Sequence, residues 1–145
     1  MSEVTNGVSN VIKLQRFHID KILFERMLGH SPSDKKKQIK PIFSRKIVRL
    51  EDSVYDVILT VTIDQDTENE KLPFAVETAV GGIFELVGIP EDQHQAALTA
   101  NASAIVFPYL RSTISTAMSL AGVQPIFLPV MNVDKVFATD NLNVE

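Results

Sequence analysis

Apolar and polar side chains alternate most regularly between residues 54 and 63. Every odd position from Tyr55 to Ile63 is apolar, whereas the even positions mix valine and isoleucine with aspartate and threonine. A period of two is typical of a β-strand, and an unbroken apolar row indicates that one face of it is covered. The pattern therefore predicts a strand in an antiparallel sheet that packs on one side.

Three other segments, residues 11–25, 41–50 and 72–80, are also predicted to be strands. In the first of them the alternation changes phase, so that the apolar pairs would lie on one face, then the other, then the first again: Ile12 and Leu14, Phe17 and Ile19, Ile22 and Phe24. Because a shift of one residue exchanges the faces of a strand, this pattern predicts a long strand with a bulge or bend.

The other two predicted strands differ in their surroundings. Charged residues lie among the apolar ones on both faces of residues 41–50, which favours an exposed strand at a sheet edge. The pair Gly81-Gly82 follows residues 72–80 and permits either a sharp turn or a close approach of backbones. The next residues, 83–89, are apolar enough to be buried.

Residues 101–122 are predicted to form one long helix, because apolar residues recur there at spacings of three and four: Ile105, Tyr109, Ile114, Ala117, Met118 and Ala121. Asn101 or Ser103 is the expected N-cap, and Gly122 the expected residue after the C-terminus. Pro108 should kink the helix or mark a second start.

The opposite side of this helix carries small polar residues: Ser112, Ser115, Thr116 and Ser119. Arg111 is the only Lys, Arg, Asp or Glu between Asp92 and Asp134. A solvated helix face usually carries lysine and glutamate, so this face is predicted to meet another surface.

Asn132 is expected to cap a short terminal helix in which Val133, Val136 and Phe137 share one face. Strands first and helices afterwards predict an α+β fold, a four-stranded antiparallel sheet with a long and a short helix on one side. We expect one domain over residues 11–138, with tails at 1–10 and 139–145.

Composition excludes several classes of protein. The chain has 145 residues, a hydrophobic fraction of 45%, a net charge of -4 and no cysteine. No apolar run is long enough to span a membrane, the first residues do not resemble a secretory signal, and a disulfide or thiolate metal site is impossible. We therefore expect a cytoplasmic protein that neither binds nucleic acid nor inserts into membranes.

No catalytic or metal site is predicted. The three histidines, His18, His30 and His94, lack metal-ligand spacing. Gly81-Gly82 is not followed by the residues of a phosphate loop, and the acidic stretch 64–70 lacks the glycine and glutamate of a calcium loop. The sequence predicts a protein that is not an enzyme and needs no cofactor.

Apolar residues also occur where a monomer would expose them, on the strand 41–50 and after the long helix. Phe43 and Ile47 belong to the strand, and the others follow Gly122: Ile126, Phe127, Leu128, Met131, Val136 and Phe137. Apolar surface of this extent is typical of an interface or of a groove for apolar ligands.

Four ordered segments, together with residues 14–25, resemble the SecB family of protein-export chaperones. They are Asp-Ser-Val-Tyr-Asp-Val-Ile-Leu-Thr-Val-Thr-Ile (52–63), Gly-Gly-Ile-Phe-Glu-Leu-Val-Gly-Ile (81–89), Ile-Val-Phe-Pro-Tyr-Leu-Arg (105–111) and Leu-Pro-Val-Met-Asn-Val-Asp-Lys-Val-Phe (128–137). The resemblance covers the chain from Ile12 to Phe137. It implies a Greek-key-like sheet, a homotetramer built as a dimer of dimers, and the polar helix face between subunits.

The resemblance also implies what the protein does. Family members hold unfolded preproteins in apolar grooves without ATP and pass them to the SecA motor. The implied groove residues are Phe43, Ile47, Phe127, Leu128, Met131 and Phe137. Glu25 and Glu77 match two acidic positions of the face that binds SecA, but Lys21 and Ala75 depart from that pattern. A positive charge in place of a negative one at this face should weaken the binding of a basic partner.

Two other functions stay open. The first is a chaperone dedicated to one partner, such as the antitoxin of a toxin-antitoxin pair, as some SecB-like proteins are. The second is a small apolar-ligand-binding protein or an enzyme, which would need a cluster of polar groups in the groove.

Overall fold

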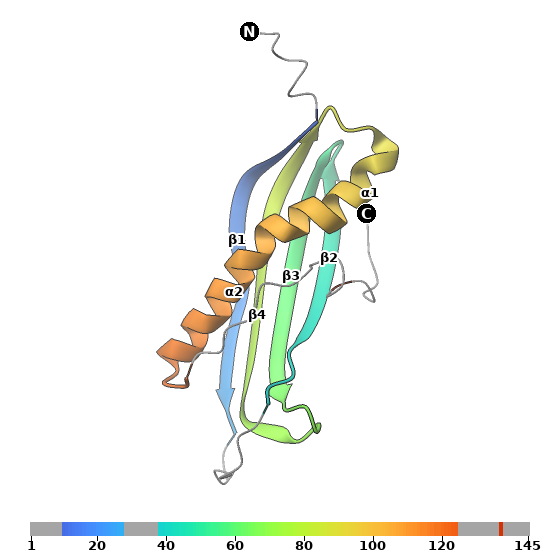
Figure 1. The fold of residues 1–145 in the computed structure, drawn as a ribbon. Coiled ribbons are helices and arrows are strands. Elements are labelled where there is room, and N and C mark those ends of the chain that lie inside the picture. Colours follow the sequence, from blue (N-terminus) through green and yellow to red (C-terminus); the bar gives the residue numbers. More distant parts are fainter. Residues whose placement is uncertain (1–9, 28–37, 125–136, 138–145) are drawn as a thin grey trace.

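The computed structural model describes residues 10–27, 38–124 and 137. Its strands are β1 (Val11–Arg26), β2 (Ile42–Glu51), β3 (Val54–Gln65) and β4 (Lys71–Val87). They form one antiparallel sheet in the order β1-β4-β3-β2, and the helical segment that follows crosses one face of it (Figure 1). The predicted α+β fold is confirmed, and β1 beside β4 gives it Greek-key order.

β1 confirms the predicted bulge. Its register with β4 shifts twice, between Leu14 and Arg16 and between Ile19 and Lys21. Each shift inserts one extra residue into β1 and so exchanges the faces of the residues after it. The shifts fall where the alternation in the sequence changes phase, and all three apolar pairs therefore lie on the face that the helix covers. The phase changes in the sequence therefore record two bulges in one continuous strand.

Of the two alternatives predicted for Gly81-Gly82, the sharp turn is excluded, because β4 runs without interruption through both glycines. The other alternative, a close approach, is the one observed. A Cβ on Gly82 would lie 2.8 Å from the ring of Phe84 and 3.0 to 3.1 Å from side chains of Leu14 and Val106. Without a side chain here, β1 and the helix both approach β4 closely.

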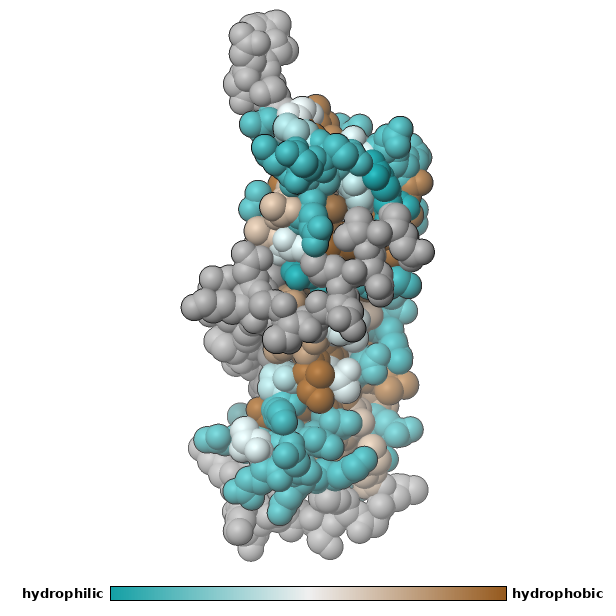
Figure 2. Space-filling model, turned by 90° about the vertical axis from the view of Figure 1, so that its right-hand side faces the viewer, coloured by the Kyte–Doolittle hydropathy of each residue, from teal (hydrophilic) through white to brown (hydrophobic). Residues whose placement is uncertain are grey.

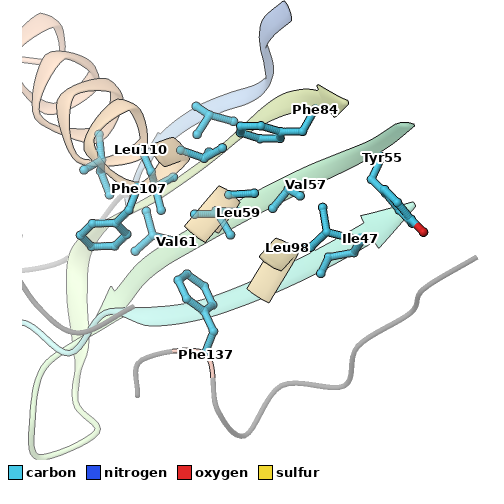
Figure 3. Close-up of a cluster of buried hydrophobic side chains, with 14 of the residues drawn as sticks. Ile47, Tyr55, Val57, Leu59, Val61, Phe84, Leu98, Phe107, Leu110 and Phe137 are labelled. Atoms are coloured by element: carbon cyan, nitrogen blue, oxygen red, sulfur yellow. The ribbon is translucent and has the colours of Figure 1, made fainter. Parts of the chain in front are cut away.

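Inward-facing residues of the sheet and helix form one hydrophobic core. The odd positions of β3 from Tyr55 to Ile63 are buried, as their alternation predicts. Figure 3 shows these side chains between the sheet and the helical residues Leu98, Phe107 and Leu110. Burying such side chains is the main favourable term in folding, at about 25 cal/mol per Å² of apolar surface.

Short helical turns lead from the sheet into the long helix, as the sequence around Pro90-Glu91-Asp92 predicts. A 3-10 turn (Glu91–Gln93) leads into α1 (His94–Ala96), a π-helical stretch (Ala97–Ala102) and α2 (Ser103–Leu120). Neither Asn101 nor Ser103 caps a helix, because both lie inside this continuous segment. Pro108 lies within α2, so it does not mark a second start.

The end of α2 is as predicted. Gly122 has a positive φ of 80°, its N–H donates to the Ser119 carbonyl, and the N–H of Val123 donates to the Met118 carbonyl. This pair of bonds is the Schellman motif, which needs a left-handed residue after the helix and so favours glycine.

The buried side of α2 differs in phase from the prediction. Ile114, Ala117 and Met118 are buried as expected, but Ile105, Tyr109 and Ala121 are exposed. The buried residues of the first turns are Val106, Phe107 and Leu110. The sequence offers apolar residues all round this part of the helix, so only packing on β4, β3 and β1 determines which of them face inward.

Residues 132–136 of the predicted short terminal helix lie outside the described part of the chain. The division into one domain with two tails stays a prediction. Among the described residues, no helix is long and apolar enough to cross a membrane.

Candidate functional site

Three of the six predicted groove residues lie in the described part of the chain. Phe43 is half-buried on β2, with its ring centroid 6.1 Å from that of Phe107 and 5.6 Å from that of Phe137. Ile47 and Phe137 are 0% exposed, so the expectation that they lie on an exposed surface is wrong. Both belong to the core cluster in Figure 3. Phe127, Leu128 and Met131 lie outside the described residues.

Alternation along β2 explains the burial of Ile47. Phe43, Arg45 and Ile47 all face the helix, and the exposed Ile42, Ser44 and Lys46 face the other side. The mixed sequence of β2 correctly predicted an edge strand, since β2 closes the described sheet. It did not reveal that one of its charges is inside.

Arg45 is the residue that sequence reasoning missed. It is 7% exposed, and its Nη1 donates to the Thr99 carbonyl at 2.9 Å and to the Ser103 hydroxyl at 3.3 Å. Its Nη2 donates to the Phe137 carbonyl at 3.4 Å, and its guanidinium lies 5.3 Å from the centre of the Phe137 ring. Arg45 therefore connects β2, the helical segment and the chain near its C-terminus.

Exposed apolar side chains gather at the β1 edge and on α2. The β1 patch consists of Ile19, Ile22 and Leu23, which are 43 to 55% exposed. On α2, Ile105, Tyr109 and Leu120 are exposed, Leu120 at 84%. The ring of Phe17 on β1 lies 4.5 Å from that of Tyr109, so the two apolar surfaces adjoin.

The predicted polar helix face lies among these residues. Ser112, Thr116 and Ser119 are exposed and Ser115 is half-buried. We define the α2 face as Ile105, Tyr109, Ser112, Thr116, Ser119 and Leu120, which are exposed and uncharged. Sequence reasoning found its hydroxyl residues but placed Ile105 and Tyr109 in the core.

Seen from the β2 side, the described surface is mostly hydrophilic, with a small apolar area near the middle (Figure 2). Ile42 and Leu50, both about half exposed, are the large exposed apolar residues of β2. Apolar surface is therefore present at both edges of the described sheet.

The predicted acidic positions lie on the sheet face opposite the helix. Glu25 is exposed on β1, whereas Glu77 on β4 accepts a hydrogen bond from the Lys21 ammonium at 3.0 Å. Ala75 is opposite Glu25 in the register of the two strands. Lys21 thus neutralises one of the two carboxylates within the chain itself.

A buried polar network holds the start of the helical segment to β3. The Ile89 carbonyl can only accept, so His94 Nε2 carries the proton in their 2.9 Å hydrogen bond. The other ring nitrogen then accepts from the Tyr55 hydroxyl at 2.9 Å. Burial raises the pKa of Tyr55, so its hydroxyl stays protonated and can donate. These groups satisfy one another, and the network is structural.

No catalytic or metal centre emerges from the described residues. They contain no group of three or more His, Cys, Asp or Glu side chains that could hold a metal ion. An open pocket of about 500 Å³ lies between the start of β1 and the first helical turns. Its lining has no ionisable side chain: Asn10, Ile12, Ile89, Gln93, Ala96, Ala97, Ala100 and Asn101. General acid-base chemistry needs such a group.

Comparison with known proteins agrees with this picture. The family model described as preprotein translocase subunit SecB matches residues 5–143. The protein-export protein SecB of Neisseria gonorrhoeae is 30% identical over 131 residues, which are 88% of each chain. That of Aromatoleum aromaticum is 27% identical over 141 residues, covering 94% of this chain and 87% of the relative.

The fold also has a solved counterpart. It is similar to that of a SecB-like chaperone of Mycobacterium tuberculosis, solved in complex with a peptide from the HigA1 antitoxin, with a TM-score of 0.67 and 10% sequence identity. The match covers 83% of this chain and 90% of that one. At this identity the likeness shows the fold.

Proposed function

Since this chain belongs to the SecB family of protein-export chaperones, we propose that it is an ATP-independent holdase. It binds unfolded preproteins on apolar surface and keeps them competent for export by the SecA-driven Sec translocase. It works in the cytoplasm, without cofactor, nucleic acid or membrane insertion, and has no enzymatic activity.

The observation that carries this proposal is the apolar surface of the single chain. Large apolar side chains are exposed on β1, β2 and α2, and the α2 face has no charge. Surface of this kind marks sites of interaction. Apolar contacts are non-directional and gain about 25 cal/mol per Å² buried, so one surface can hold many unrelated unfolded segments.

Assembly divides this surface between two tasks. We assign the α2 face, with Ser112, Ser115, Thr116 and Ser119, to contacts between subunits in a homotetramer that is a dimer of dimers. Clients then bind near Phe43 together with Phe127, Leu128 and Met131. Because Ile47 and Phe137 are buried, we assign them a supporting role instead of direct contact with a client.

Aggregation of a chemically unfolded reporter protein tests client holding. The double variant Phe127→Ala with Leu128→Ala is expected to suppress aggregation several-fold less well than the wild type, because two large apolar contacts are lost. Leu50→Ala removes an exposed apolar side chain of β2 that is not assigned to the client site, and it should leave suppression unchanged. A folded double variant as active as the wild type would refute the proposed client site.

SecA binding is the second test. Lys21→Glu removes the ion pair to Glu77 and adds a third negative charge beside Glu25 and Glu77. The affinity for SecA should therefore rise about tenfold. Lys46→Glu, an equal change of charge on β2 on the same sheet face, is the control. Titration calorimetry at low and high salt measures both. If Lys21→Glu binds SecA no more tightly than the Lys46→Glu control does, this role of the acidic face is contradicted.

One specific observation favours a second candidate function. The Lys21–Glu77 pair already neutralises part of the acidic face, which suits a chaperone that serves one dedicated partner, such as an antitoxin, instead of SecA. The antitoxin peptide bound by the solved relative is a precedent for this use of the fold. Complete absence of SecA binding by the wild type would favour this alternative over the export function.

A further inference from the structure

His18 lies between two carboxylates on the sheet face opposite the helix. Its Nδ1 is 2.5 Å from an oxygen of Asp20, and its Nε2 is 2.8 Å from an oxygen of Asp56. Asp20 belongs to β1 itself, whereas Asp56 belongs to β3, two strands away. The imidazole ring therefore reaches across the whole width of β4.

The glycine beneath the ring makes this reach possible. His18 is opposite Gly81 in the register of β1 and β4. A Cβ on Gly81 would lie 2.3 Å from Cε1 of the His18 ring and 2.6 Å from Nε2. Non-bonded atoms do not approach this closely, so any other residue at this position would displace the ring. The slot that holds His18 is built into β4.

Asp20 reaches the ring because of a strand irregularity. It stands at the second register shift of β1, between Ile19 and Lys21. In a regular strand, the side chains of His18 and Asp20 would lie on the same face but too far apart for this contact. A bulge increases the local twist and redirects a side chain, which brings Asp20 to the ring. The two carboxylates thus approach the ring from β1 and from β3.

Hydrogen-bond chemistry fixes the protonation state of this arrangement. Ionised carboxylate oxygens accept hydrogen bonds and donate none. Both ring nitrogens must therefore carry a proton, and only the imidazolium cation does so. A neutral ring has one N–H and would place a nitrogen lone pair against a carboxylate oxygen.

We propose that protonated His18 is a staple that fastens the edge strand β1 to β3 across β4, and that its deprotonation loosens β1. β1 is paired with β4 alone among the described strands, so a contact to β3 adds a second point of attachment.

The charges around His18 agree with this role. Partial burial opposes protonation, but the hydrogen bonds to Asp56 and Asp20 and the charges of both outweigh it and raise the pKa of His18. On β4 the residues flanking Gly81 on this face, Ala79 and Ile83, are uncharged. The other charged groups of this face are, on β1, Lys13, Arg16, Lys21 and Glu25, on β4, Glu77 and Glu85, and, on β2, Lys46 and Glu51.

The direction of the pH dependence follows from the raised pKa. A group that is protonated more easily in the folded state stabilises that state below its unfolded pKa of 6.5. This contribution is lost as the pH rises through the higher pKa of the folded state. β1 should therefore be held most firmly in mildly acidic solution.

Hydrogen exchange of the full-length protein tests the staple. The exchange rates of the β1 amides are divided by their intrinsic rates at each pH and compared with those of β3. The resulting opening of β1 should increase several-fold between pH 5.5 and pH 8.5. His18→Gln should remove this dependence, and Gly81→Ala should weaken it by displacing the ring. Asp92→Asn, a change in an exposed carboxylate outside the sheet, should preserve it.

Two results would overturn the proposal. One is a pH-dependent opening of β1 that persists in His18→Gln. The other is an NMR titration in which the His18 imidazole, identified by its loss in His18→Gln, titrates at or below 6.5. A change in β1 exchange that His18→Gln abolishes, together with titration above 6.5, supports it.

Discussion

Arg45→Ala is expected to lower the free energy of unfolding by about 3 kcal/mol. The guanidinium is 7% exposed and donates to the carbonyls of Thr99 and Phe137 and to the Ser103 hydroxyl. Its removal leaves those acceptors without this donor and opens a cavity between β2 and the helical segment. Both effects act in the same direction.

The π-helical stretch makes the Thr99 carbonyl depend on Arg45. An α-helix would direct the Ser103 N–H to that carbonyl, but here it is directed to those of Leu98 and Ala100. The Ser103 hydroxyl also donates to Leu98, at 2.9 Å. Arg45 therefore supplies a hydrogen bond that the widened turn has removed from the backbone ladder.

Urea unfolding at one protein concentration measures this effect, since the stability of an oligomer depends on concentration. Lys46→Ala is the matched control, because Lys46 is the next residue along β2 and is exposed on the opposite face. It should change the unfolding free energy by less than about 0.5 kcal/mol. Equal effects of the two variants would show that Arg45 does not hold the layers together.

Thr116→Glu is expected to reduce the proposed tetramer to dimers. Thr116 is exposed on the uncharged α2 face, which we assign to contacts between subunits. In a two-fold interface the same residue enters from both subunits, so each substitution buries two like charges. A cost of about 3 kcal/mol corresponds to about a hundred-fold increase in the dissociation constant.

Light scattering across a range of protein concentrations measures the assembly. Thr116→Gln has a side chain of similar length without the charge and should remain tetrameric. Gln95→Glu adds one negative charge at an exposed position outside α2 and should also remain tetrameric. A Thr116→Glu protein with the mass of the wild type would show that this face is not the interface.

Local periodicity explains which features of the fold were predictable. Alternation in β3, the phase changes of β1 and the glycine after α2 each depend on neighbours within a few residues. Such patterns are consequences of strand and helix geometry, so a single sequence contains them. The hydroxyl residues of the α2 face were predictable for the same reason, whereas the exposure of Ile105 and Tyr109 was not.

The candidate site was predicted less well. Sequence placed Ile47 and Phe137 on an exposed surface, because an apolar residue in a charged strand or near a chain end shows no sign of what covers it. It also gave no reason to place Arg45 in the core, although Phe43 and Ile47 flank it at the spacing of one strand face. Recognition of that row required the knowledge that this face of β2 is covered.

Patterns of residues along the chain were thus enough to predict the four strands, the long helix, the family and the absence of charge from one side of α2. The packing of the layers was needed to show which side of α2 faces the sheet, why β4 passes straight through Gly81 and Gly82, and which residues Arg45 and His18 contact. The Thr99 and Asp56 atoms that these two residues contact are 54 and 38 positions away along the chain. Contacts at such separations depend on how the layers pack, and no local pattern of residues encodes them.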